Sequence, residues 1–147
     1  MKILQIIPYF LTEKGGDVSV CANLSRELVC KGHDVTILTS DYQIKNKTIP
    51  SVPGVKIIFF KTFMKYGNFY FTPALARWMK KNLENYDVVH THSLRSYQNI
   101  QLSKYADIFN KPVIVQAHGS VSLNIGNSKL KKYFDCIYLK KIIENLD

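Results

Sequence analysis

Three of the four histidines in this 147-residue chain stand at the ends of two apolar segments. His90 and His92 close one segment, and His118 closes another. An imidazole at such a position can hydrogen-bond a substrate or take part in proton transfer near neutral pH. His118 is the strongest candidate for a catalytic residue, because Gly119 and a polar loop follow it directly.

His90 and His92 are two positions apart, so in a strand their side chains would point to the same face. Such a pair could ligate a metal ion, but no third ligand stands at a suitable spacing, and we expect no metal site. Histidines within strands are more often buried structural residues, and we interpret His90 in that way. His92 is equally consistent with a structural role and with a place in a functional site.

Two adjacent glycines, Gly15 and Gly16, precede a segment with helical periodicity. A helix start offers free backbone N–H groups and a positive dipole end, and glycine lets a phosphate or sugar approach the backbone closely. A Gly-Gly pair before a helix is equally typical of a simple tight turn. The pair is not a GxGxxG motif, so bound NAD or FAD is not expected.

Strand-like and helix-like segments alternate along the chain and would position these residues. Short apolar runs predict strands at 3–7, 35–39, 55–60, 87–92 and 113–118. Helix signals predict helices from an N-cap at Asp17 to about Lys31, from Thr72-Pro73 onward, from about Tyr97 to Phe109, and from about Ser128. This alternation predicts one α/β, Rossmann-like three-layer domain over residues 1–147, with a parallel sheet of strand order 3-2-1-4-5.

Ligands of open α/β sheets bind beyond the carboxyl ends of the strands, at the point where the strand order reverses. In the expected order that point lies between the first and fourth strands. Gly15 and Gly16 follow the first strand, His92 ends the fourth and His118 ends the fifth. Because neighbouring strands are ~4.8 Å apart, we expect these residues to share one crevice.

The composition restricts the class of protein. A hydrophobic fraction of 46% with 21% charged residues is typical of a globular domain, and no apolar run approaches the ~18 residues of a membrane span. The start of the chain does not resemble a secretory signal, and the three cysteines show no paired spacing, which favours free thiols and a cytoplasmic location. The net charge of +9 comes from dispersed lysines, which favours a solvated surface; an anionic substrate, membrane or nucleic acid are the alternatives.

Taken in order and spacing, several segments resemble the N-terminal, acceptor-side domain of the family 4 retaining glycosyltransferases, whose fold is called GT-B. The resemblance spans almost the whole chain. It is carried by KILQIIPYF (2–10), the glycine pair at 15–16, KGHDVTILT (31–39), DVVHTH (87–92) and PVIVQAHG (112–119).

The resemblance implies that a sugar, of the hexosyl type, passes from a UDP- or GDP-sugar to a sugar or lipid-linked acceptor. The anomeric configuration would be retained, no metal or tightly bound cofactor would be needed, and the product would be a polysaccharide or glycolipid. It further implies a catalytic role for His118 beside the donor sugar and an acceptor-side position for His92. The glycines at 15, 16 and 119 would face the donor phosphates and the acceptor.

Enzymes of this family bind the nucleotide mainly on a second, C-terminal Rossmann domain that carries a pair of glutamates. These 147 residues contain no such region. We therefore expect half of a GT-B fold: an isolated domain, a truncated gene product, or a subunit whose other half is separate. By itself the chain is expected to be inactive.

A different class of function is a non-catalytic module that docks an acceptor, a membrane surface or a partner subunit. The segment 59–71 combines aromatic residues with lysines, which suits the interface of an anionic membrane and would make the protein peripheral to it. The same segment is better explained by a strand followed by a loop whose aromatics pack on the core. Nucleic-acid binding is not expected, since neither an RNP-like pattern nor helix-turn-helix spacing is present.

Overall fold

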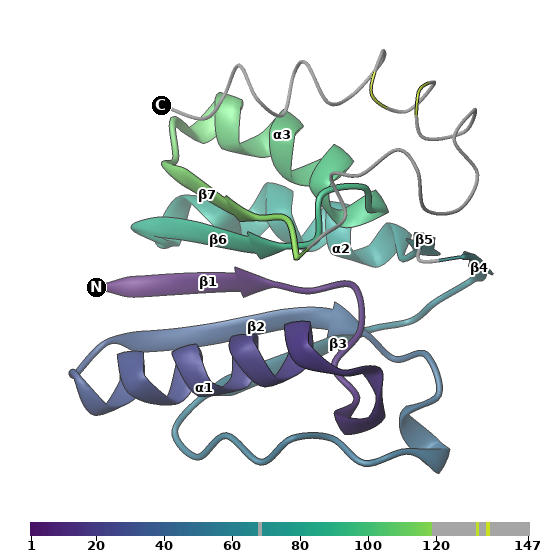
Figure 1. The fold of residues 1–147 in the computed structure, drawn as a ribbon. Helices are drawn as coiled ribbons and strands as arrows, with labels where there is room; N and C mark the ends of the chain where they lie inside the picture. The colour runs from purple at the N-terminus through teal and green to yellow at the C-terminus, as the bar shows by residue number, and fades with distance from the viewer. Residues whose placement is uncertain (68, 119–131, 133–134, 136–147) are drawn as a thin grey trace.

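The computed structural model describes residues 1–67, 69–118, 132 and 135. A parallel sheet forms the middle layer, with α1 (Gly16–Cys30) on one face and α2 (Pro73–Asn82) and α3 (Tyr97–Phe109) on the other (Figure 1). The sheet contains β1 (Lys2–Ile6), β2 (Asp34–Ser40), β3 (Lys56–Phe60), β6 (Val88–His92) and β7 (Val113–Gln116). Two further strands, β4 (Met64–Tyr66) and β5 (Phe69–Phe71), pair with each other, and short 3₁₀ turns are η1 (Thr12–Lys14), η2 (Ile44–Asn46) and η3 (Leu83–Asn85).

The strand order of the main sheet is β3-β2-β1-β6-β7, and every pairing in it is parallel. Counted within this sheet alone, the order is 3-2-1-4-5, which confirms the predicted Rossmann-like topology. The reversal point lies between β1 and β6. A binding site is therefore expected beyond the carboxyl ends of these two strands.

The central strand β1 is covered on both sides. Leu4 and Ile6 belong to the apolar cluster formed with α2 and α3, whereas Ile7 lies in the cluster formed with α1. All three side chains are fully buried. This burial explains why the strand reads as a nearly continuous apolar run.

The start of α1 differs from the prediction. Gly15, not Asp17, is the N-cap residue, and it has φ 106° and ψ −150°, a conformation that is essentially restricted to glycine. Asp17 is already inside the helix, and its carboxylate accepts hydrogen bonds from the Tyr9 hydroxyl and from the backbone N–H of Val18. The predicted stop is confirmed: Gly32 has φ 82°, and its N–H donates to the carbonyl of Val29 at 2.9 Å.

The segment 59–71 was predicted as a strand followed by a loop, but the part after β3 contains the antiparallel pair β4–β5. Tyr70 is fully buried, as the packing interpretation expects. Phe63 and Tyr66 are 65% and 66% exposed, so that interpretation is wrong for these two aromatics. A three-residue strand lacks the length for a clear alternating pattern, which is why the sequence did not reveal the pair.

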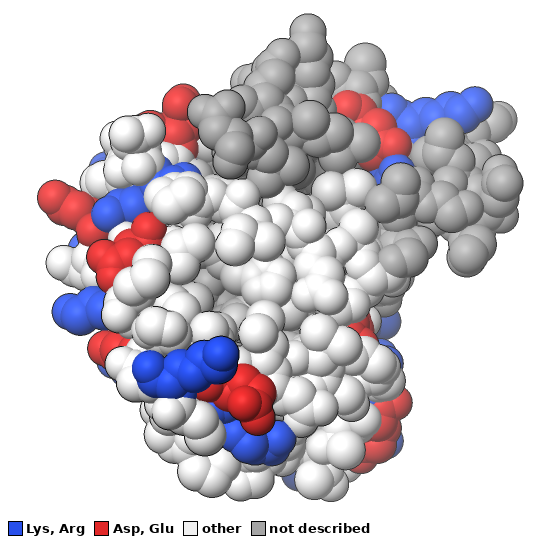
Figure 2. All heavy atoms as spheres, turned by 60° about the vertical axis from the view of Figure 1, so that its left-hand side comes forward, with Lys and Arg blue, Asp and Glu red and all other residues white. Residues whose placement is uncertain are grey.

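The surface shown in Figure 2, seen from the side of the amino ends of the strands, carries lysine and arginine next to aspartate and glutamate around an uncharged centre.

Within the described residues no helix has the length and apolar character needed to cross a membrane. The helix predicted from Ser128 lies outside the described residues.

Candidate functional site

Two of the predicted site residues meet where β6 and β7 end. His92 is the last residue of β6 and is paired in register with Gln116 of β7. His118 follows two positions later, and its Nε2 lies 2.8 Å from Nδ1 of His92. The two rings are stacked with centroids 5.1 Å apart. His118 has φ 46°, a left-handed conformation that a residue with a side chain adopts at an energetic cost and that is common at functional sites.

Gln5, in the middle of β1, completes a chain of three hydrogen-bonded side chains. Its Oε1 lies 2.8 Å from Nε2 of His92, and both residues are fully buried. An amide oxygen only accepts, so Nε2 of His92 carries the hydrogen and its Nδ1 has a lone pair. His118 then donates from Nε2 to His92. Gln5 was not predicted as a site residue; the available signal was a polar amide within an otherwise apolar strand.

His90 supplies a third imidazole, which packs against the ring of His92. The ring centroids of His90 and His92 are 4.4 Å apart, and His90 is buried. Burial, followed by the nearby charges of His90 and His118, lowers the pKa of His92 to about 3. The pKa of His90 is lowered by burial and by the charge of His118. His92 is therefore neutral at physiological pH and acts as a hydrogen-bond acceptor toward His118.

An open cleft brings the glycine segment and His118 together. Its lining residues are Tyr9, Gly16, Asp17, Val20 and His118. They come from the loop after β1, from the first turns of α1 and from the end of β7, as expected for the carboxyl edge of the sheet. A Cβ added to Gly16 would meet no atom within 4 Å, so the backbone is freely approachable there.

Gly15 acts differently from its neighbour. It is not among the residues that line the cleft, but its backbone conformation at φ 106° turns the chain into α1. The two predicted glycines therefore occupy different structural positions. Gly15 shapes the turn that leads into α1, and Gly16 lies on the surface of the cleft. Gly119, the remaining predicted residue, lies outside the described residues.

Tyr9 and Asp17 form a polar pair on the wall of the cleft. The Tyr9 hydroxyl donates to Oδ2 of Asp17 at 2.5 Å, and Nζ of Lys14 lies 5.4 Å from the centre of the Tyr9 ring. Burial and the bond to Asp17 raise the pKa of Tyr9, so its hydroxyl remains protonated. A paired carboxylate beside a helix start can accept hydrogen bonds from the hydroxyl groups of a sugar. The sequence analysis had assigned Asp17 only to capping.

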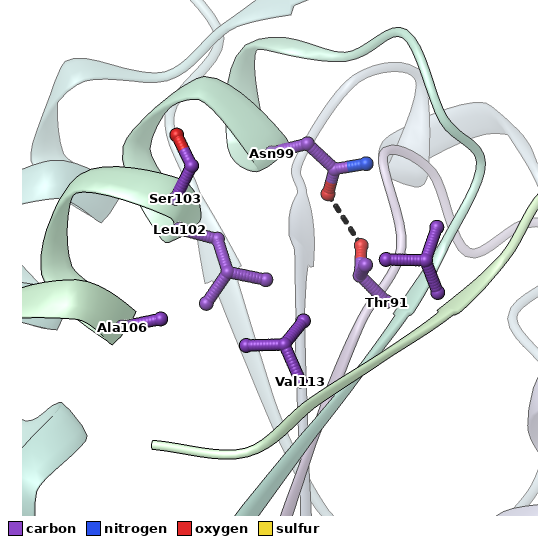
Figure 3. Close-up of a pocket in the computed structure, with 7 residues that line it drawn as sticks. Thr91, Asn99, Leu102, Ser103, Ala106 and Val113 are labelled. Carbon is purple, nitrogen blue, oxygen red and sulfur yellow. Dashed lines mark hydrogen bonds between the residues drawn. The ribbon is translucent and has the colours of Figure 1, made fainter. Parts of the chain in front are cut away.

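The loop after β6 is held by one buried amide. Asn99 donates through Nδ2 to the carbonyl groups of Ser93 (2.6 Å) and Leu94 (3.0 Å) and accepts from the Thr91 hydroxyl at 2.5 Å (Figure 3). Ser93 has φ 75°, so this bonding stabilises a strained backbone next to His92.

The cavity drawn in Figure 3 is not a substrate site. It lies between α3 and strands β6 and β7 and has a volume of about 10 Å³. That is close to the smallest space able to hold one water molecule. Among the described residues, no group of three or more histidine, cysteine, aspartate or glutamate side chains could hold a metal ion.

The strand order, the crossover helices and the cleft at the reversal point define a Rossmann-like domain of the kind that forms half of a GT-B glycosyltransferase. The family model for Glycosyltransferase Family 4 matches residues 14–147. The chain belongs to this family, and the described structure is that of a glycosyltransferase N-terminal domain.

A solved structure supports the fold. The crystal structure of Anabaena HepE in complex with UDP superimposes with a TM-score of 0.60 at 11% sequence identity. The match covers 99% of this chain but 35% of the HepE chain. A comparison with curated proteins found no match.

Proposed function

We propose that this domain, together with a second Rossmann domain, transfers a sugar from a UDP- or GDP-sugar to a hydroxyl group of a sugar or lipid-linked acceptor, with retention of configuration. The observation that carries the proposal is that Gly16, at the start of α1, and His118, at the end of β7, line one cleft. In this reaction the bond from the anomeric carbon to the diphosphate oxygen breaks. A bond to the acceptor oxygen forms on the same face of the sugar, and the proton of the acceptor hydroxyl passes to the departing diphosphate oxygen.

The start of α1 suits the leaving group. Departure of a nucleoside diphosphate builds negative charge, and the free N–H groups and positive dipole end of a helix start stabilise such charge. Gly15 gives the turn its shape and Gly16 leaves its backbone open. Both roles require the absence of a side chain, but for different reasons.

His118 is proposed as the catalytic residue beside the donor sugar. A glycosyl transition state has oxocarbenium character, and a positioned polar group near the ring favours it. His92 holds the imidazole of His118 through the 2.8 Å hydrogen bond, and Gln5 holds His92 in turn. His92 is thus a positioning residue in this proposal, on the side of the acceptor.

The nucleotide itself is proposed to bind mainly to a second domain outside these 147 residues. The chain spans 35% of the length of HepE, whose crystal structure contains UDP. With only one wall of the cleft present, we expect weak binding of nucleotide sugars and no turnover. No tightly bound cofactor is required by this reaction.

Calorimetric titration with UDP- and GDP-sugars tests the proposal directly. The 147-residue chain should bind weakly, and protein that carries both halves should bind at least one donor and transfer its sugar. Proton NMR of the product's anomeric signal reports retention or inversion. Tight donor binding by the chain alone would show that the nucleotide site lies on this domain, and failure of transfer by both halves together would refute the catalytic assignment.

A further inference from the structure

The segment after β3 exposes an unusual concentration of apolar surface. Phe63, Met64 and Tyr66 are 65%, 62% and 66% exposed. Seven large hydrophobic side chains are exposed among the described residues, and three of them lie within residues 63–66. Scattered single exposed side chains are ordinary on protein surfaces, whereas a contiguous group marks an interaction site. We call Lys61, Phe63, Met64, Lys65 and Tyr66 the hairpin face.

The positive charge of the chain is concentrated in the sequence segment that contains this face. Residues 42–83 contain eight lysines and arginines and no aspartate or glutamate, whereas the rest of the chain has twelve basic and eleven acidic residues. The net charge of +9 is therefore almost entirely that of one segment.

Both lysines of the hairpin face lie near aromatic rings. Nζ of Lys61 lies 5.4 Å from the centre of the Phe63 ring. Nζ of Lys65 lies 5.3 Å from the ring of Tyr42 and 5.7 Å from that of Tyr70. Two ammonium groups thus belong to the same short segment as the exposed apolar side chains.

The hairpin face also lies next to the cleft. The β4–β5 pair sits at the end of the sheet toward which β1, β2 and β6 point (Figure 1). The buried ring of Tyr70, from β5, is 5.7 Å from that of Tyr9, which lines the cleft. A surface that engages the hairpin face therefore comes close to the mouth of the cleft.

We propose that the hairpin face docks this domain onto the surface of an anionic lipid membrane. Phenylalanine, tyrosine and methionine side chains suit the boundary between headgroups and acyl chains, and lysines are attracted to acidic headgroups. A second copy of the chain is a poor occupant, because two segments with eight basic and no acidic residues would repel each other. The docking does not depend on the catalytic proposal, although it would bring a lipid-linked acceptor near the cleft.

Vesicle flotation tests the proposal. The chain should float with vesicles of phosphatidylglycerol and phosphatidylcholine, should not float with phosphatidylcholine alone, and should be released by high salt, because the attraction is screened. Phe63→Ser with Tyr66→Ser should weaken binding by about tenfold or more, the consequence of losing two buried apolar side chains. Lys61→Gln and Lys65→Gln should each weaken it about fivefold.

Ile108→Ser is the matched control, because Ile108 is 61% exposed on α3, outside the hairpin face. Its binding should equal that of the unchanged chain, and far-UV circular dichroism should show that all variants are folded. Three results would overturn the proposal. They are absence of binding to the anionic vesicles, equal binding by the Phe63/Tyr66 variant, or a concentration-dependent dimer that this variant abolishes.

Discussion

Nδ1 of His92 lies 2.8 Å from Nε2 of His118, across 26 positions of sequence. The parallel pairing of β6 with β7 produces this contact, since it places the carboxyl ends of both strands at the same edge. Because Nε2 of His92 is occupied by Gln5, only Nδ1 remains to accept from His118. The tautomer of one buried imidazole thus determines the orientation of the imidazole that lines the cleft.

The first prediction concerns His118. In protein that carries both halves, His118→Ala should lower kcat by about 10² or more, the usual scale for a positioned polar or acid–base group, with a smaller effect on the donor KM. If His118 only terminates β7, the substitution would lower the unfolding temperature and leave turnover per folded molecule unchanged. His33→Ala is the better control: His33 lies in the turn before β2, whereas His90 packs on His92 and would disturb the site.

The second prediction concerns Gln5. Gln5→Leu removes the acceptor of His92 Nε2 and leaves a buried donor unpaired, which should cost about 1–3 kcal/mol of unfolding free energy. The decisive measurement is long-range proton–nitrogen NMR of the imidazole rings. The unchanged chain should show His92 as the single tautomer with hydrogen on Nε2, and Gln5→Leu should mix its tautomers. If the tautomer of His92 does not change in the Gln5→Leu variant, Gln5 contributes only packing and does not orient His92.

A third prediction follows from the low pKa of His92. Its folded-state pKa is about 3, below the ordinary value of 6.5. As pH falls below 6.5, His92 becomes protonated in the unfolded chain but stays neutral in the folded chain. The free energy of unfolding therefore decreases toward acid pH. Between pH 7 and pH 5 this residue should remove about 2 kcal/mol of unfolding free energy. Urea unfolding across that pH range measures the loss. His92→Asn should make the unfolding free energy less dependent on pH. The same pH dependence in the unchanged chain and in the variant would contradict the low pKa of His92.

The fourth prediction separates the two glycines. Gly15→Ala forces a side chain into φ 106° and should cost about 1–3 kcal/mol of stability. Gly16→Ala meets no atom within 4 Å and should leave stability nearly unchanged, while its methyl group projects at the cleft and weakens donor binding. Thermal unfolding and donor titration, both performed on protein that carries both halves, distinguish the effects. Equal losses of stability in the two variants would contradict the assignment of different roles to Gly15 and Gly16.

The order of the sheet could be predicted because each strand and helix has a local signal. Apolar runs identified the five strands, and α3 spans the predicted Tyr97–Phe109. The β4–β5 pair could not be predicted, since three-residue strands carry no readable period and their aromatics were expected in the core. Asp17 was misassigned because aspartate is equally suited to capping and to pairing with a tyrosine, and the position of Tyr9 was unknown.

By itself, the sequence determined the topology of the sheet, because strand direction follows from the alternation of strands and helices. It therefore also determined the edge of the sheet at which His92, His118 and the glycine pair would lie. The tertiary structure alone decided which atoms meet. The contact between Gln5 and His92 joins residues 87 positions apart. Such a contact depends on strand register and on the rotamers that packing allows, and neither is encoded in any short stretch of sequence.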